Sequence, residues 1–289
     1  MSNNNAKLCL GTVQMGQNYG ISNSRGMIPE MEVFQILDRA YAHQIRVLDT
    51  APVYGLAQER IGKYHKITGN KFDIITKLPR CHKDDISAII NNGLSTLEID
   101  CLEGILIHDY ESREYSEQYH EEFLKQKRNG GVKKIGFSLN SVSELTSIID
   151  RNLLFDIVQI PFNLCDRRFY PYFELLKSRN VEIHIRSVFL QGLLIMPPKL
   201  IPKNLENILI VREMLENYSK TLHLGIETIA LGFVFSIKNI DRVLIGVDSL
   251  DNLEKNIQAI HSLPVFKETD FADLIINDEK IINPSNWNV

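Results

Sequence analysis

The sequence predicts an α/β protein of the (β/α)8 TIM barrel class, folded as a single domain over residues 1–289. Three observations predict this fold. Eight short apolar or β-branched runs recur along the chain, segments with helical spacing lie between them, and no linker rich in Pro, Gly or Ser divides the sequence near its middle. A G-x-G-x-x-G fingerprint is absent after the first run, which argues against an open dinucleotide-binding sheet.

The eight runs are the expected strands, because near-continuous apolar runs are typical of parallel strands that are covered on both faces. They span residues 7–10, 46–48, 72–76, 104–107, 133–136, 156–160, 181–186 and 242–246. Apolar residues recur at helical spacing between them, as in residues 33–41, 86–97 and 225–238. Strand and helix therefore alternate along the whole chain.

Two stretches exceed this simple repeat. Residues 197–222 are expected to form a loop and an extra helix after the seventh strand. Residues 262–289 form a C-terminal tail. Of its two readings, a lid over the barrel mouth or a segment packed on the outside, we favour outside packing.

Composition limits the partners. The formal net charge is −4, which gives no positive field to hold nucleic acid or an anionic membrane. The longest apolar stretch, residues 228–237, is about half of the ~20 residues that a membrane helix needs. The four cysteines form no C-x-x-C pair, so reduced thiols and no metal site are expected. We expect a cytoplasmic protein, since no secretory leader begins the sequence. A monomer or homodimer that acts on a small carbonyl substrate is also expected.

Polar residues follow the second, third and fourth expected strands, where a barrel builds its active site. They are Asp49, Tyr54, Lys77 and His108. Each alone has an ordinary explanation, such as a helix cap or a surface charge. Four titratable groups of different kinds at successive strand ends are much harder to explain as an accident.

At these residues the sequence resembles the aldo-keto reductase family. The matching segments are LDTAPVYG, ITKL and LIHD, together with LGTVQMG, KKIGFS, DIVQIPFNL, SVFLQGLL and GVDSLDNLEKN, from about residue 8 to residue 260. The resemblance implies an enzyme that passes a hydride between a nicotinamide cofactor and the carbonyl of an aldehyde or keto sugar. The residues of these segments are similar to those of a bacterial branch associated with sugar and surface-polysaccharide metabolism, so a role in carbohydrate metabolism is expected.

The four residue types suit that chemistry. Tyr54 would be the general acid/base, but a free phenol with a pKa near ~10 gives up its proton reluctantly at neutral pH. A buried ammonium at Lys77 would favour the phenolate, and Asp49 would keep that ammonium charged. His108 would donate to the same carbonyl oxygen.

The resemblance also implies the cofactor contacts. These are Ser138, Gln159, Arg186, Ser187, Phe189, Gln191, Gly192, Gly246, Val247, Ser249, Asn252 and Asn256. Leu139 departs from the asparagine common after the serine, a loss that Asn140 could make good. Arg186 stands where many members stack an aromatic ring, and its fixed charge would act on the cofactor or the substrate.

NADPH is the expected cofactor, and NADH is admissible. Asn252 occupies a position often held by an arginine that binds the 2′-phosphate, and Asp248, Asp251 and Glu254 surround it.

Candidate substrate contacts are Tyr19, Arg80, Tyr110 and Arg167. Two or more arginines facing the mouth would indicate an anionic substrate. The alternative for Arg167 and Arg168 is that they cap or decorate the following helix.

Two other functions are compatible with these residues. One is a regulatory barrel that binds the cofactor and senses redox state with little turnover. The other is a Schiff-base enzyme with Lys77 as nucleophile, against which the pairing of Asp49 and Tyr54 argues.

Overall fold

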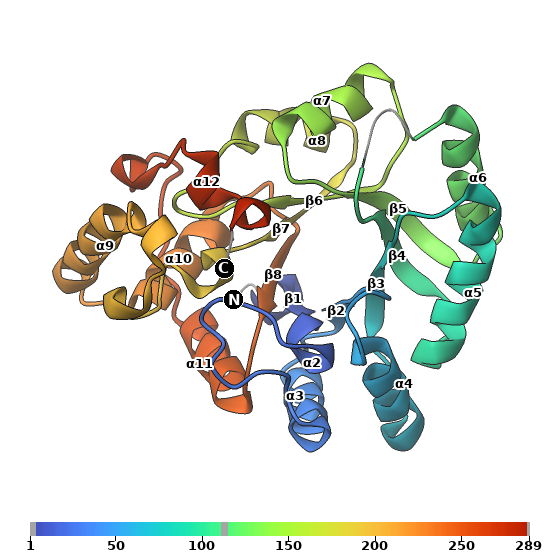
Figure 1. Cartoon of the computed structure of the whole chain (residues 1–289), viewed down its shortest axis with the longest axis horizontal. Helices are drawn as coiled ribbons and strands as arrows, with labels where there is room; N and C mark the ends of the chain where they lie inside the picture. The colour runs from blue at the N-terminus through green and yellow to red at the C-terminus, as the bar shows by residue number, and fades with distance from the viewer. Residues whose placement is uncertain (1–3, 111–114, 288–289) are drawn as a thin grey trace.

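Eight parallel strands close into a barrel in the order β1 to β8, with β8 paired to β1 (Figure 1). The computed structural model describes residues 4–110 and 115–287. The strands are β1 Leu8–Gly11, β2 Val47–Asp49, β3 Asp73–Leu78, β4 Leu102–Ile107, β5 Val132–Ser138, β6 Ile157–Pro161, β7 Glu182–Arg186 and β8 Arg242–Gly246. The expected (β/α)8 TIM barrel is confirmed, and the strand limits differ from the expected ones by a few residues.

Helices surround the barrel in Figure 1. They are α3 Glu30–Ala42, α4 Ala57–Thr68, α5 Ile86–Leu97, α6 Glu117–Arg128, α7 Val142–Asp150, α8 Phe173–Ser178, α10 Ile226–Ser236 and α11 Leu250–His261. Serine side chains cap three of them: Ser116 begins α6, Ser141 begins α7 in a capping box with Glu144, and Ser249 begins α11. No helix within the described ranges has the length and apolar character needed to cross a bilayer.

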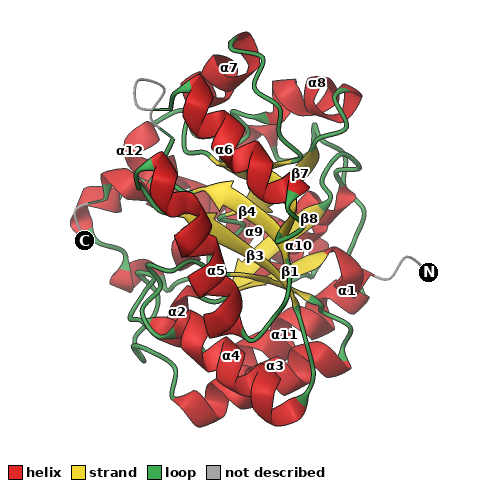
Figure 2. Ribbon diagram, turned by 90° about the vertical axis from the view of Figure 1, so that its right-hand side faces the viewer, coloured by secondary structure: helices red, strands yellow, loops and turns green. Residues whose placement is uncertain are grey.

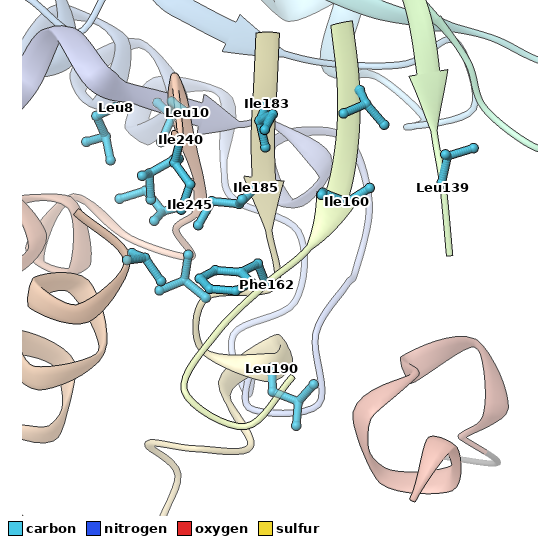
Figure 3. Close-up of a cluster of buried hydrophobic side chains, with 14 of the residues drawn as sticks. Leu8, Leu10, Leu139, Ile160, Phe162, Ile183, Ile185, Leu190, Ile240 and Ile245 are labelled. Carbon is cyan, nitrogen blue, oxygen red and sulfur yellow. The ribbon is translucent and has the colours of Figure 1, made fainter. Parts of the chain in front are cut away.

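The strands alternate between two faces, as the period of two in a β-strand requires. Leu10, Ile160, Ile185 and Ile245 lie in the apolar layer between the strands and the helices, and Figure 3 shows part of this layer around Phe162. The intervening residues face the barrel interior. Inward side chains at the carboxyl ends of the strands therefore meet in one place.

A small apolar cluster fills the middle of the barrel. It consists of Cys9, Val47, Ile75, Leu106 and Ile157, with Leu244 packed against it. Glycine is required beside this cluster, because a Cβ at Gly136 would lie 2.0 Å from the Ile157 carbonyl oxygen. Since this cluster fills the centre, polar chemistry is confined to the space above it, at the carboxyl ends of the strands.

Residues 197–222 contain two short 3-10 turns followed by the helix α9 Ile208–Leu222. Two further short helices, α1 Asn4–Lys7 and α2 Val13–Gly16, flank β1.

The C-terminal tail first packs on α10, where Phe266 N–H donates to Ser236 Oγ at 3.0 Å, and then reaches the loops at the carboxyl end of the barrel. It carries the helix α12 Glu279–Ile282, which lies on the opposite side of the strands from α1 in Figure 2. Arg167 donates hydrogen bonds to the carbonyls of Glu268, Asp270 and Phe271, and so attaches the tail to the loop after β6. Residues 284–285 enter the wall of the cavity described below. The expectation of outside packing is therefore wrong for this part of the tail.

Candidate active site

A cavity of about 700 Å³ opens at the carboxyl end of the strands. This volume is in the range of small-molecule sites. One end of the cavity is lined by Asp49, Tyr54, Lys77, His108, Ser138, Gln159 and Arg186, and the other by Gly246, Asp248 and Asn252. Residues from all eight strands or the loops after them thus reach one continuous space.

A chain of polar contacts forms the floor of the cavity. Lys77 and Asp49 make an ion pair in which both side chains are 3% exposed. Gln159 Nε2 donates to Asp49 Oδ2 at 2.8 Å, and Ser138 Oγ donates to Gln159 Oε1 at 3.3 Å. Lys77 Nζ also donates to the Thr50 carbonyl at 3.3 Å. These inward residues come from four different strands, or from the residue after one of them, and hold one another in place.

The charge of Lys77 is maintained by its neighbours. Burial alone would lower the pKa of this lysine, but the charge of Asp49, with contributions from Tyr54 and a hydrogen bond to Asp49, outweighs burial and raises it. Lys77 is therefore an ammonium at neutral pH.

Tyr54 lies in the loop after β2, with its ring close to both Lys77 and His108. Lys77 Nζ is 5.0 Å from the Tyr54 ring centroid, and the Tyr54 and His108 centroids are 6.0 Å apart with the rings edge to face at 84°. The backbone of Tyr54 packs directly on α2, where a Cβ at Gly16 would lie 1.8 Å from the Tyr54 carbonyl oxygen. Gly55 follows with φ of 53°, a left-handed conformation that suits glycine.

His108 is a neutral imidazole over most of the accessible pH range. Burial lowers its pKa to about 4, and the positive charge of Lys77 adds to the effect. A neutral imidazole has one N–H to donate. His108 can therefore offer a hydrogen bond beside the Tyr54 hydroxyl without contributing a charge of its own.

Arg186 ends β7 and is fixed by three neutral acceptors. Its guanidinium donates to the Leu139 carbonyl at 3.0 Å, to Asn140 Oδ1 and to Ser187 Oγ. The guanidinium has five N–H groups, so donors remain for a ligand.

The loop after β7 is strained and lies above the cavity. Ser187, Leu190 and Gln191 have φ of 63°, 50° and 51°, and Gly192 has φ of 91°. Such positive values in non-glycine residues persist only where the surrounding structure holds them, and they cluster at ligand sites. Gln191 Nε2 donates to the Tyr19 hydroxyl at 2.9 Å, which joins this loop to the loop after β1.

The far end of the cavity lies where β8 leads into α11. Gly246 leaves room for the side chain of Gln14, since a Cβ there would lie 2.9 Å from Gln14 Nε2. Gln14 Oε1 is buried with no hydrogen-bond partner within the described chain. Such a group is costly to bury unless a ligand or water satisfies it.

The family model for the aldo/keto reductases matches residues 7–276. The chain belongs to the aldo/keto reductase family. It is therefore an oxidoreductase, and the cofactor of this family is NADPH.

Individual relatives are more distant. L-galactose dehydrogenase from Arabidopsis thaliana is 25% identical over 82% of this chain and 81% of its own length. The holo form of an aldo-keto reductase from Bacillus halodurans superposes with a TM-score of 0.79 at 20% identity, covering 97% of this chain and 95% of that one. An aldo/keto reductase from Klebsiella pneumoniae in complex with NADP and acetate gives 0.69 at 16% identity, covering 93% and 89%. At these identities, the two structures show the fold.

Most of the expected cofactor residues of this aldo/keto reductase line the cavity. They are Ser138, Gln159, Arg186, Ser187, Phe189, Gln191, Gly192, Gly246 and Asn252. Three others do not. Val247 is buried in the apolar core just after β8. Ser249 caps α11 by accepting from the Asn252 amide, and Asn256 donates to Asn252 Oδ1 one helical turn later.

Three of the four expected substrate contacts lie outside the cavity. Tyr110 is 3% exposed and directs its hydroxyl to Ser147 and Arg151, away from the cavity. Arg80 lines a separate small pocket, where it lies 3.5 Å from Asp109. Arg167 holds the tail. Tyr19 does line the cavity.

The rim arginines therefore do not meet the criterion for an anionic substrate. Arg168 donates to both oxygens of Asp166 and to Glu279, so it also serves the tail. Among the described arginines, Arg186 alone lines the cavity.

Several cavity residues escaped the sequence analysis. Thr12 and Gln14 directly follow β1, so applying the strand-end rule to the first strand would have found them. Pro284 and Ser285 come from the tail, and no local signal identifies them. Within residues 4–110 and 115–287, no group of three or more His, Cys, Asp or Glu could hold a metal ion.

Proposed function

We propose that this enzyme transfers a hydride between a nicotinamide dinucleotide and the carbonyl carbon of an aldehyde or keto sugar, with Tyr54 as general acid/base. The observation that carries the proposal is the position of the Tyr54 ring, beside the buried Lys77–Asp49 pair on one side and neutral His108 on the other.

The cavity fits a dinucleotide in three respects. Its volume is sufficient, Gln14 Oε1 lacks a partner among the described residues, and the strained loop of residues 187–192 lines the space. Ser138 and Gln159 would hold the nicotinamide carboxamide. The backbone near Gly192 would approach the pyrophosphate, and Asn252 would face the adenosine half.

The residues of this chain can then carry the proton. When bound, the dinucleotide supplies or accepts the hydride at its nicotinamide ring. Tyr54 donates a proton to the carbonyl oxygen during reduction and takes one from the hydroxyl during oxidation. Lys77, kept charged by Asp49, stabilises the phenolate form of Tyr54. His108 donates an N–H to the same substrate oxygen and shares its developing charge.

We include NADH beside NADPH in the proposal. Three cations beside Asp248 or α11 are each paired with a carboxylate: Arg25 with Glu32, Arg39 with Glu254 and Lys255 with Asp251. Asp248 itself lines the cavity. A carboxylate near the ribose suits a 2′-hydroxyl, whereas a 2′-phosphate normally requires an arginine or lysine.

A sugar substrate is supported by the relative named L-galactose dehydrogenase and by the polar wall of the cavity. Asp109, Asn140 and Ser285 all contribute to that wall and can bind hydroxyl groups.

The test is a comparison of the wild type with Tyr54→Phe. Dinucleotide binding is followed by fluorescence titration, and turnover is followed over a panel of aldehydes, keto sugars and reducing sugars in both directions. We expect Tyr54→Phe to keep dinucleotide binding and to lose about 10²–10⁴-fold in turnover. Tyr172→Phe, on the 3-10 turn before α8 and outside the cavity, is the matched control. Retained turnover in Tyr54→Phe would refute the assignment of the general acid/base.

The other two functions gain no support. Lys77 is held as an ammonium by Asp49, so it lacks the free electron pair that a Schiff base requires. The comparisons do not support a regulatory barrel with little turnover.

A further inference from the structure

Arg186 brings into the cavity a positive charge that forms no ion pair with a described carboxylate. Its recorded acceptors are a backbone carbonyl, an amide oxygen and a hydroxyl, all neutral. Within residues 4–110 and 115–287, no Asp or Glu lies within ion-pair distance of its guanidinium, and the nearby Asp166 is bound by Arg168. The charge of Lys77, by contrast, is matched by Asp49.

The strand register places Arg186 at the reacting end of the cavity. Gln159 pairs with His184, and Pro161 pairs with Arg186, so Arg186 lies one inward step nearer the mouth than Gln159 on the neighbouring strand. The reacting carbonyl must lie beside Tyr54 and His108, and the hydride donor about 3–3.5 Å from it. A nicotinamide ring bound beside that carbonyl would lie between Gln159 and Arg186.

The field of Arg186 reaches this space. Burial is the main cause of the low pKa of His108, but the positive charges of Lys77 and Arg186 both contribute to it. A charge that acts on His108 also acts on a ring held beside the same substrate.

We propose that Arg186 disfavours the oxidised, cationic nicotinamide ring and thereby biases the bound pair toward alcohol oxidation, the dehydrogenase direction. The proposal rests on the proposed function. The oxidised ring carries a positive charge and the reduced ring is neutral, so a fixed cation nearby separates their affinities. An aromatic side chain at this position would instead attract the cationic ring.

The charge balance of the step gives the direction. In oxidation, the substrate carbon transfers a hydride with its two electrons to the ring, and the hydroxyl proton passes to Tyr54. The alcohol becomes a carbonyl, and the ring loses its positive charge. Repulsion by Arg186 is present before the step and is removed by it. By thermodynamic linkage, the ratio of the affinities for the reduced and the oxidised dinucleotide sets the factor by which the equilibrium between bound alcohol and bound carbonyl shifts on the enzyme.

The test measures binding and needs no turnover. The dissociation constants of the oxidised and the reduced dinucleotide are determined by calorimetric titration for the wild type, Arg186→Gln and Arg186→Lys. We expect the ratio of the oxidised to the reduced constant to fall about tenfold or more in Arg186→Gln and to be largely kept in Arg186→Lys. Arg80→Gln, which removes an arginine outside the cavity, should leave the ratio unchanged.

Other results would overturn the inference. An equal loss of affinity for both forms in Arg186→Gln would mean that Arg186 binds a group common to both, such as a phosphate. An unchanged ratio would mean that its charge does not reach the ring. Circular dichroism shows whether each variant folds. Arg186→Met also removes the charge and replaces Arg186→Gln if that variant does not fold. Failure of the wild type to bind either dinucleotide would refute the proposed function itself, so the two failures are distinguishable.

Discussion

Replacing Asp49 by Asn measures how much the negative charge of Asp49 contributes to the stability of the polar floor of the cavity. The amide is nearly the same size as the carboxylate, so packing is preserved while the negative charge is removed. Lys77, whose side chain is 3% exposed, is then left in the interior without a balancing charge. Leaving one partner of a buried pair uncompensated typically costs about 3–5 kcal/mol. We expect a loss of this size in the free energy of unfolding of Asp49→Asn at neutral pH.

The pH dependence of the loss has a definite sign. In the wild type the native pKa of Lys77 is raised, so its contribution to stability is present below the unfolded value near ~10.4 and is lost only as the pH rises through the native value. In Asp49→Asn, burial is the main remaining influence and lowers the native pKa. The unfolded chain then binds the extra proton between the two values, and the stability of the variant increases as the pH rises. The difference from the wild type should therefore be largest near neutral pH and should narrow toward pH ~10.

Urea denaturation at about pH 7 and about pH 9.5 measures both effects. Glu30→Gln is the control, because it breaks an exposed pair with Lys63 in which the side chains are 39% and 53% exposed. That change should cost less than about 1 kcal/mol at either pH. A cost below about 1 kcal/mol for Asp49→Asn, or a difference that does not narrow at high pH, would refute the reasoning.

The remaining predictions concern the site. Gly16→Ala should lower turnover at least about tenfold and destabilise the fold by about 1–3 kcal/mol, because its Cβ would lie 1.8 Å from the Tyr54 carbonyl oxygen. Gly93→Ala, with open space around the new Cβ, should keep full turnover, and equal effects of the two would contradict this account. Since burial lowers the pKa of His108 to about 4, wild-type stability should fall as the pH drops from about 6.5 to about 4, and His108→Gln should flatten that slope in acid titrations. Asp248→Ala should increase NADPH affinity several-fold in fluorescence titrations and leave NADH affinity nearly unchanged; a parallel change in both would show that Asp248 lies away from the 2′-position.

The parts of the site that the sequence revealed are those fixed by strand topology. Asp49, Lys77 and Gln159 lie at or near the ends of buried parallel strands, and closure of the barrel brings such ends together whatever the loops do. Their polar contacts follow because inward side chains at neighbouring strand ends are close. The same reasoning would have included Thr12 and Gln14 had it been applied to the first strand.

Side-chain direction beyond the strand ends could not be read from the sequence. Tyr110 comes only two residues after His108, yet it turns outward to contact Arg151 and Ser147 on the side of α7. Once the chain leaves β4, the alternation of the strand no longer determines which face a residue occupies.

Partners far away in the sequence explain why the prediction for Arg167 failed. They also bear on whether the substrate is an anion. Arg167 bonds to carbonyls about a hundred positions away in the chain, and Arg168 bonds to Glu279 at a similar separation. Both arginines are thereby committed to the tail, whose Pro284 and Ser285 then complete the cavity wall. Neither Arg167 nor Arg168 is therefore available to a substrate anion. Among the described arginines, Arg186 alone lines the cavity, so it is the one that can act on the charge of the cofactor or of the substrate. A variant at this position distinguishes an effect on the cofactor from an effect on the substrate.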